Sequence, residues 1–156
     1  MYFFADGKGL SAMATERVSA GPGFFGKTHY AVLGLAGLSH FLNDATQSLL
    51  VPSYPLFKDS FGLSFTQIGL ITLTYQLTAS LLQPAVGWFT DRHPLPFSLP
   101  VGMVFSLSGL LLMSVAPSYH FLLMAVALLG VGSSVFHPES SRVARLASGG
   151  QFGLAQ

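Results

Sequence analysis

The sequence has no cysteine and very little charge. Without Cys the chain can form no disulfide framework, no thiolate metal site and no thiol nucleophile. Charged residues make up 8% of the 156 residues, against about 25% in a typical soluble domain. The formal net charge is +1, and there is no basic stripe of the kind that binds nucleic acid. The composition therefore argues against a soluble domain and against a nucleic-acid partner.

The sequence also lacks the motifs of common enzyme sites. It has neither a phosphate-binding loop nor a dinucleotide-binding fingerprint. Ser140 and Ser141 lack the flanking glycines of a nucleophilic serine turn. His137 and Glu139 could suggest a metal pair, but Pro138 lies between them and no third ligand is within local reach. We therefore expect no enzymatic activity, no cofactor and no metal site.

Long apolar runs dominate what is present. From Tyr30 to Phe136 there are five charged residues, and four of them lie in the gaps between the runs. Lipid offers no hydrogen bonds, so spanning segments must be helices of about 20 mostly apolar residues. The sequence therefore predicts an all-α membrane bundle with four transmembrane helices within residues 30–136. The predicted spans are Tyr30–Val51, Phe65–Phe89, Phe97–Ala116 and Tyr119–Phe136.

The two flanking segments differ from the apolar centre. Residues 1–29 are mixed and Gly-rich, and they predict a flexible cytoplasmic segment in which Met13 is a plausible alternative start. In residues 137–156, Pro138 suits the first position of a new helix. The arginines that follow predict that this helix lies on the inner membrane surface, near anionic headgroups. Beyond Gly150 no element is completed, so we expect a truncated end.

The distribution of Lys and Arg predicts the orientation. Basic residues near the ends of spans mark the cytoplasmic side. Six of the seven lie on the side that holds the N-terminus, the loop after the second span and the tail. We therefore expect a multi-pass membrane protein with a cytoplasmic N-terminus. The six are Lys8, Arg17, Lys27, Arg92, Arg142 and Arg145, and the seventh is Lys58.

The first predicted span carries a polar stripe of His40, Asn43, Asp44 and Gln47. Their spacing of i, i+3, i+4 and i+7 places them on one helical face. Asp44 is the one charged residue inside an apolar run, and a carboxylate there costs roughly 2.5–3.5 kcal/mol on insertion scales. We interpret the stripe as a proton and solute pathway in which Asp44 binds a proton or a cation. The alternative is hydrogen bonding between helices, worth about 0.6 kcal/mol per bond.

A second polar stripe lies in the second predicted span. Thr72, Gln76, Ser80 and Gln83 fall at i, i+4, i+8 and i+11, again on one face. Two stripes on neighbouring helices can line the same cavity, so Gln76 and Gln83 join the predicted pathway. Hydrogen bonding between helices is again the alternative. Pro84 removes a helical hydrogen bond and predicts a kink.

The third and fourth predicted spans carry small residues in place of a polar stripe. Gly102 and Ser106 are four residues apart, as are Gly130 and Ser134. Small residues at this spacing let two helix backbones approach closely. We expect these faces to be packing surfaces.

The expected short cytoplasmic loop after the second span contains Gly87-Trp88-Phe89-Thr90-Asp91-Arg92. In sequence and in position it resembles the signature loop of the major facilitator superfamily of transporters. Gly130-Val131-Gly132 resembles the end of that superfamily's fourth-helix motif. Three longer stretches are similar to the fosmidomycin-resistance group of drug exporters. They are Ser39–Asp44, Leu81–Pro84 and Phe136–Arg142.

This resemblance implies an inner-membrane secondary transporter built from two six-helix halves, with the solute site between them. The implied partners are the lipid bilayer, protons, a small organic solute and the missing C-terminal helices. In the superfamily, the Asp and Arg of the signature form the cytoplasmic gate and its Gly allows close helix approach. The resemblance therefore implies these roles for Asp91, Arg92 and Gly87. Asp44 becomes the leading protonation candidate in an exchange of inward protons for an outward drug.

The sequence departs from the superfamily pattern at two places. Pro94, Leu95 and Pro96 replace the second glycine and the trailing basic residues of the signature. The arginine expected ahead of the fourth-helix glycine is Val126, so the resemblance assigns no proton relay to that position. Only the first four helices are expected within the chain, and these alone should be unable to transport.

Two other functions stay open at this point. Small multidrug antiporters are dimers of four-helix chains with one carboxylate in the first helix, although they are shorter and lack the Asp-Arg signature. A non-transporting membrane assembly protein would use its polar stripes only to hold helices together. An in-frame continuation of the encoding DNA with further hydrophobic runs would favour the transporter fragment. A genuine stop after Gln156 would favour either alternative.

A reporter fused after Gln156 tests the predicted orientation. Six basic residues against one predict a cytoplasmic C-terminus after four spans. We therefore expect activity from a reporter that works only in the cytoplasm and none from alkaline phosphatase, which works only in the periplasm. Periplasmic activity of the fusion would contradict the assigned orientation.

Overall fold

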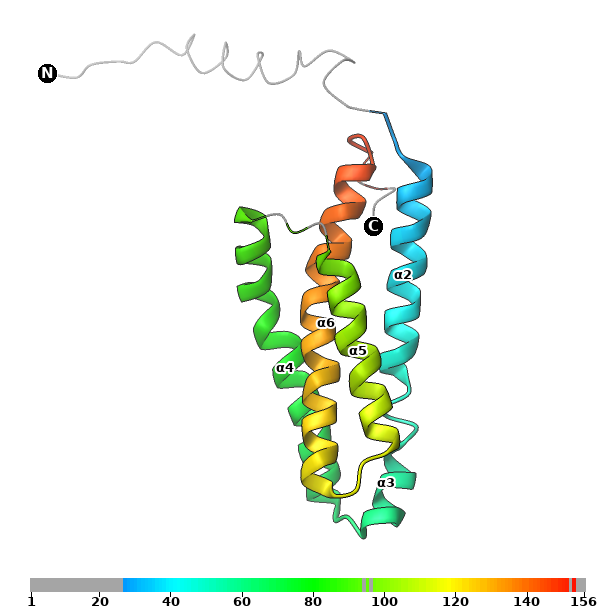
Figure 1. Ribbon diagram of the computed structural model, residues 1–156, viewed down its shortest axis with the longest axis vertical. Helices are drawn as coiled ribbons and strands as arrows, with labels where there is room; N and C mark the ends of the chain where they lie inside the picture. The colour runs from blue at the N-terminus through cyan, green and yellow to red at the C-terminus, as the bar shows by residue number, and fades with distance from the viewer. Residues whose placement is uncertain (1–26, 94, 96, 152, 154–156) are drawn as a thin grey trace, which may run out of the picture.

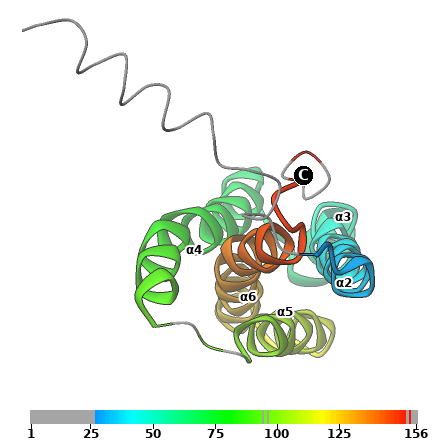
Figure 2. The same ribbon diagram turned by 90° about the horizontal axis from the view of Figure 1, so that it is seen from above.

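The computed structural model describes residues 27–93, 95, 97–151 and 153. These residues form five α-helices and no strand, so the predicted all-α fold is confirmed. α6 lies at the centre, and α2, α4 and α5 pack against it (Figures 1 and 2). Most of the segment expected to be flexible, and most of the expected truncated end, lie outside the described residues. The helices are α2 (Tyr30–Ser48), α3 (Tyr54–Phe61), α4 (Phe65–Arg92), α5 (Ser98–Ser114) and α6 (Tyr119–Ala147).

The gap between the first two predicted spans contains a further, short helix. α2 ends at Ser48, and the eight-residue α3 follows after a turn. Pro55 lies in the first turn of α3, where its fixed φ suits a helix and its missing N–H removes no bond. Gly62 ends the helix with φ of 61°, the left-handed conformation that glycine favours. Pro55 and Gly62 therefore set the two ends of this short helix.

α4 begins where predicted and ends later than predicted. At its start the Ser64 hydroxyl accepts the Gln67 backbone N–H at 3.3 Å, and the Gln67 side chain accepts the Ser64 N–H at 2.9 Å. This reciprocal pair satisfies two free donors of the first turn. At the other end the helix continues through Asp91 and Arg92. The expected loop position of these two residues is therefore wrong, since they form the last helical turn.

α6 runs without interruption over 29 residues. The separate helix expected to start at Pro138 is wrong, because Pro138 lies inside α6. Proline in a helix interior removes one backbone hydrogen bond. Phe136 and Glu139, on either side of it, are buried in the bundle, and their packing keeps the helix continuous despite the missing hydrogen bond. The position of residues 137–147 at the inner membrane surface stays a prediction.

Small residues bring α5 and α6 into close contact. A Cβ added at Gly102 would lie 3.2 Å from the carbonyl oxygen of Gly132, and one added at Gly109 would lie 2.8 Å from the carbonyl oxygen of Ala125. On its other side α6 meets α4, where a Cβ at Gly130 would lie 2.9 Å from the carbonyl oxygen of Tyr75. The predicted packing role of these small residues is confirmed.

The bundle has a small apolar core and a large apolar exterior. Ile71, Leu122 and Leu129 are fully buried at the centre of the core. Long apolar side chains also cover the outside of the helices. Soluble monomers rarely expose so much contiguous apolar surface, whereas lipid tails are as apolar as leucine. The exposed side chains include Leu35, Leu38, Phe41, Leu81, Val104, Leu111 and Met124.

By length and composition, one helix of the described residues is able to cross a membrane, and it is α6. α5 is also apolar but has only 17 residues. α2 and α4 carry the polar stripes, which lower their hydropathy. The expected number of four spans therefore stays a prediction.

Gly132→Ala should destabilise the bundle. The added Cβ would lie 2.7 Å from the carbonyl oxygen of Gly102, so α5 and α6 would have to separate, and overpacking of this kind costs about 1–3 kcal/mol. Gly37→Ala is the matched control, because it adds the same methyl group to α2 with nothing within 4 Å. We expect thermal unfolding in detergent micelles, followed by circular dichroism, to occur at lower temperature for Gly132→Ala only. Equal midpoints for the two variants would contradict the close approach.

Candidate functional site

The polar stripe of α2 faces other helices. Each of its four residues makes a polar contact across the bundle, and between them these contacts reach α4, α5 and α6. The stripe therefore connects α2 to all of the other long helices. Its members are His40, Asn43, Asp44 and Gln47.

Asn43 and Gln47 form the buried part of the stripe. Asn43 has no exposed surface, and its Oδ1 accepts a hydrogen bond from the Ser106 hydroxyl of α5 at 2.9 Å. Gln47 Oε1 accepts from the Tyr75 hydroxyl of α4 and from the Ser133 hydroxyl of α6. Both amide nitrogens are buried without a hydrogen-bond partner among the described residues. Buried polar groups are nearly always paired, so these two donors are suited to a polar ligand.

Asp44 is the centre of an ionisable cluster that also contains His40 and His137. Its Oδ2 lies 3.3 Å from Nε2 of His40, and its Oδ1 lies 4.0 Å from Nε2 of His137. The two imidazole rings are 5.2 Å apart between centroids. The Asp44 side chain is 51% exposed, so the cluster is open on one side. A carboxylate with two imidazoles beside it can bind a proton or a metal ion.

His137 was missed as a member of this cluster. The sequence suggested His137 only as a metal partner of Glu139, with no third ligand within local reach. The structure instead places His137 beside Asp44, because α2 and α6 lie side by side. Helical spacing relates residues within one helix only. The one signal in the sequence was the transporter-like stretch Phe136–Arg142, which marks the segment without naming its partner.

Glu139 belongs to a second polar group, the buried ion pair with Arg142. Arg142 donates from Nε to Oε1 at 3.1 Å and from Nη2 to Oε2 at 2.7 Å. Ser98, at the start of α5, also donates to Oε2. Glu139 has no exposed surface, and bidentate charge-assisted hydrogen bonds satisfy its carboxylate. Arg142 is thus held by Glu139, and its expected position near lipid headgroups stays a prediction.

The residues predicted to form a gate lie in the last turns of α4. Asp91 and Arg92 are both exposed. The Arg92 guanidinium lies over the Trp88 ring, 4.2 Å from its centroid, and donates to the Trp88 carbonyl at 3.1 Å. Asp91 forms no ion pair with any other residue that the structure describes. A Cβ at Gly87 would meet Pro138 at 3.7 Å, an ordinary contact, so α4 and α6 approach here without requiring glycine.

The structure does not bring Gln76 and Gln83 to the Asp44 cluster. Gln76 is exposed and Gln83 is half-buried, and neither forms a side-chain hydrogen bond among the described residues. Tyr75 makes the contact between α4 and the stripe instead. A role for Gln76 and Gln83 in a solute pathway stays a prediction.

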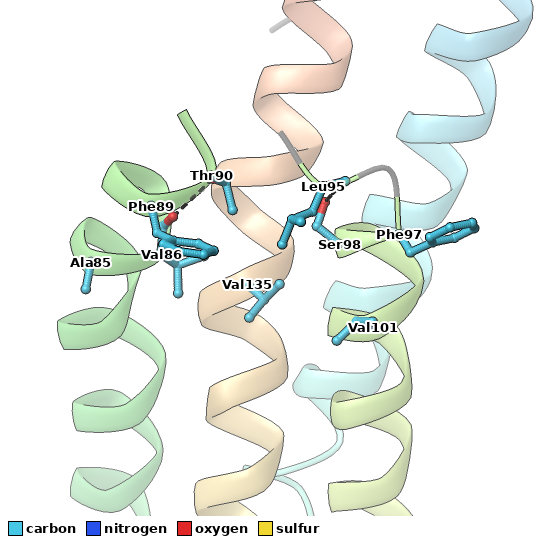
Figure 3. A pocket seen from close by; sticks show the side chains of 9 residues that line it. All are labelled: Ala85, Val86, Phe89, Thr90, Leu95, Phe97, Ser98, Val101 and Val135. Atoms are coloured by element: carbon cyan, nitrogen blue, oxygen red, sulfur yellow. Dashed lines mark hydrogen bonds between the residues drawn. The ribbon is translucent and has the colours of Figure 1, made fainter. Parts of the chain in front are cut away.

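An apolar cavity of about 500 Å³ lies where the end of α4 and the start of α5 meet α6 (Figure 3). The Thr90 hydroxyl is used within α4, because it donates to the carbonyl of Val86 at 3.0 Å. The cavity therefore offers almost entirely apolar surface, and it contains no residue of the Asp44 cluster. Its lining residues are Ala85, Val86, Phe89, Thr90, Leu95, Phe97, Ser98, Val101 and Val135.

Known proteins resemble the chain over most of its length. It is 60% identical over 130 residues to the fosmidomycin resistance protein of Escherichia coli K12, covering 83% of this chain and 32% of that protein. It is 44% identical over 131 residues to the uncharacterized MFS-type transporter YfnC of Bacillus subtilis 168, covering 84% of this chain and 32% of that protein. The chain thus spans about a third of the length of these curated relatives. No solved structure matches it significantly.

The sequence profile of the Major Facilitator Superfamily matches residues 36–156. This range includes the Gly87–Arg92 signature, the polar stripe and α6 from end to end. The first relative also confirms the predicted similarity to the fosmidomycin-resistance group. The helical bundle is therefore a membrane bundle, and the chain belongs to the major facilitator superfamily.

Proposed function

We propose that the chain forms part of a proton-coupled exporter of a small organic solute in the bacterial inner membrane, with its N-terminus in the cytoplasm. The observation that carries this proposal is the Asp44 cluster. It places a half-exposed carboxylate beside two imidazoles in a bundle whose exterior is apolar. Ionisable groups at such positions mark ion pathways. Membership of the superfamily removes the small multidrug antiporters from consideration.

In this proposal Asp44 carries the coupling proton. Protonation would remove the charge that attracts His40 at 3.3 Å and His137 at 4.0 Å, and so would weaken the contact between α2 and α6 at this level. Asn43 and Gln47 hold α2 in register through Ser106, Tyr75 and Ser133. Their amide donors, which are buried without a partner among the described residues, would be presented to the solute by a change of conformation that opens the bundle.

The solute in this proposal is a drug of the kind to which the Escherichia coli relative gives resistance. The support is the 60% identity with the fosmidomycin resistance protein. The aligned region is about a third of that relative, so export requires the remaining two thirds to be present.

The last turns of α4 would act as the gate on the cytoplasmic side. Asp91 is exposed and has no ion-pair partner among the described residues, so its carboxylate is free to bind a group on the opposite half of a whole transporter. Arg92 is held by Trp88, which leaves Asp91 as the more available of the two charges.

A fusion protein tests the proposed export and the role of Asp44 together. The full chain is joined to the part of the Escherichia coli relative that follows the aligned region, and it is expressed in cells lacking that relative. We expect the fusion to restore resistance to fosmidomycin. Asp44→Asn should abolish it, because Asn keeps the shape and hydrogen bonding of Asp but cannot ionise.

The matched control for Asp44→Asn is Asp59→Asn, the same substitution at an exposed position of α3. It should leave resistance unchanged, and immunoblots should show equal amounts of both variants in the membrane. Uphill export by the Asp44→Asn fusion would make Asp44 structural. A well-inserted fusion that gives no resistance at all would favour a non-transporting assembly protein.

Asp91→Ala should change the accessibility of the two faces in the same fusion. Loss of an interaction worth about 1.4 kcal/mol in one conformation changes the population ratio tenfold. The chain has no Cys, so single cysteines can report labelling from each side once those of the added part are removed. We expect Asp91→Ala to shift labelling and Asp59→Ala to leave it unchanged. Unchanged labelling with lost solute binding would place Asp91 in a binding site.

A further inference from the structure

The ligand atoms of His40, Asp44 and His137 lie within 4.8 Å of one another. His40 and Asp44 are one helical turn apart on α2, and His137 faces them from α6. The geometry points to a binding site for a divalent transition-metal ion of the Zn²⁺ class, held by two imidazoles and one carboxylate. Metal binding at these atoms does not require transport, so this inference is independent of the proposed function.

The distances suit one metal ion with a small adjustment. Zn²⁺ binds imidazole nitrogen and carboxylate oxygen at about 2.0–2.2 Å, which places tetrahedral ligand atoms roughly 3.4 Å apart. Asp44 Oδ2 and His40 Nε2 already have this spacing, at 3.3 Å. The 4.0 Å between the other carboxylate oxygen, Asp44 Oδ1, and His137 Nε2, and separations of up to 4.8 Å within the set, require shifts of up to about 1.4 Å. The His137 side chain is 30% exposed.

Ser140 orients His40 for metal binding. The Ser140 hydroxyl donates to the backbone carbonyl of His137 at 3.1 Å. Its proton is therefore used, and it accepts from Nδ1 of His40, also at 3.1 Å. This assigns the Nδ1-protonated tautomer to neutral His40, so the lone pair of Nε2 faces the Asp44 carboxylate. Two acceptors at 3.3 Å repel each other unless a proton or a metal cation lies between them, and a second hydrogen bond on the far ring nitrogen is typical of histidines that bind metals.

The ligand types select the metal. Two imidazole nitrogens and one carboxylate suit Zn²⁺, Co²⁺ or Ni²⁺, whereas Mg²⁺ and Ca²⁺ prefer all-oxygen ligands. Exposure of the Asp44 and His40 side chains, 51% and 40%, gives the ion a route from water. It also leaves a coordination position for a water molecule or a ligand group, as in open zinc sites.

Zinc titration of the full chain tests the site. The chain is purified in detergent with a tag that contains no histidine and titrated with ZnCl₂ by calorimetry. We expect one Zn²⁺ per chain, and an affinity that is lowered at least about tenfold by His137→Gln or Asp44→Asn. Ser140→Ala keeps all three ligands and should weaken binding roughly 10-fold to 100-fold, the range for groups that orient a metal-binding histidine.

The matched control is His120→Gln, which changes an exposed histidine near the opposite end of α6 and should leave the affinity unchanged. Circular dichroism checks that each variant keeps its helices. A second measurement needs no variant. When Co²⁺ is added to the unmodified chain, we expect the intense visible absorption of a four-coordinate Co²⁺ site. Absence of that absorption, absence of Zn²⁺ binding, or equal affinity of the His137→Gln and His120→Gln variants would each overturn the inference.

Discussion

The close approach of α5 and α6 determines where the polar side chains of the bundle meet. Helices in lipid gain little from the hydrophobic effect, so their association depends on packing and on hydrogen bonds. Gly132 allows a backbone contact that a Cβ at this position would prevent, and Gly102 on the facing helix leaves little space for one. Because α6 also packs on α4 and α2, its position against α5 sets its position against both of them. That register brings Ser133 to Gln47 and His137 to Asp44.

The polar groups of the bundle differ in their access to water. The Asp44 cluster is partly exposed and its geometry is loose enough to respond to a bound cation. In the Glu139–Arg142 pair the carboxylate is buried and accepts from both Arg142 and Ser98, while Arg142 is partly exposed. An isolated buried charge is very costly, whereas a well-bonded pair is tolerated. Removal of one partner alone is strongly destabilising. The first group therefore suits a role in exchange with solvent, and the second suits the joining of α5 to α6.

The sequence predicted those features that depend on local spacing. The four long helices, the inward stripe of α2 and the small-residue faces all follow from the period of the helix. The errors have non-local causes. Pro138 was interpreted as a helix start, although it lies inside α6. Phe136 and Glu139 beside it are buried by other helices, and that burial cannot be predicted from local spacing. Asp91 and Arg92 were placed in a loop, although the last turn of α4 continues through them. His137 could not be assigned to Asp44, since the pairing depends on the register between α2 and α6.

The continuity of α6 mechanically couples its two polar groups. His137 and Glu139 are two residues apart, and they face α2 and α5 on different sides of the same helix. If the helix turns as a rigid rod, a rotation that moves His137 away from Asp44 also moves Glu139 relative to Ser98. Each contact then resists the breaking of the other, and both change together. Pro138, the one proline inside α6, lies between them, so a bend at that residue is what would allow one contact to change while the other is kept.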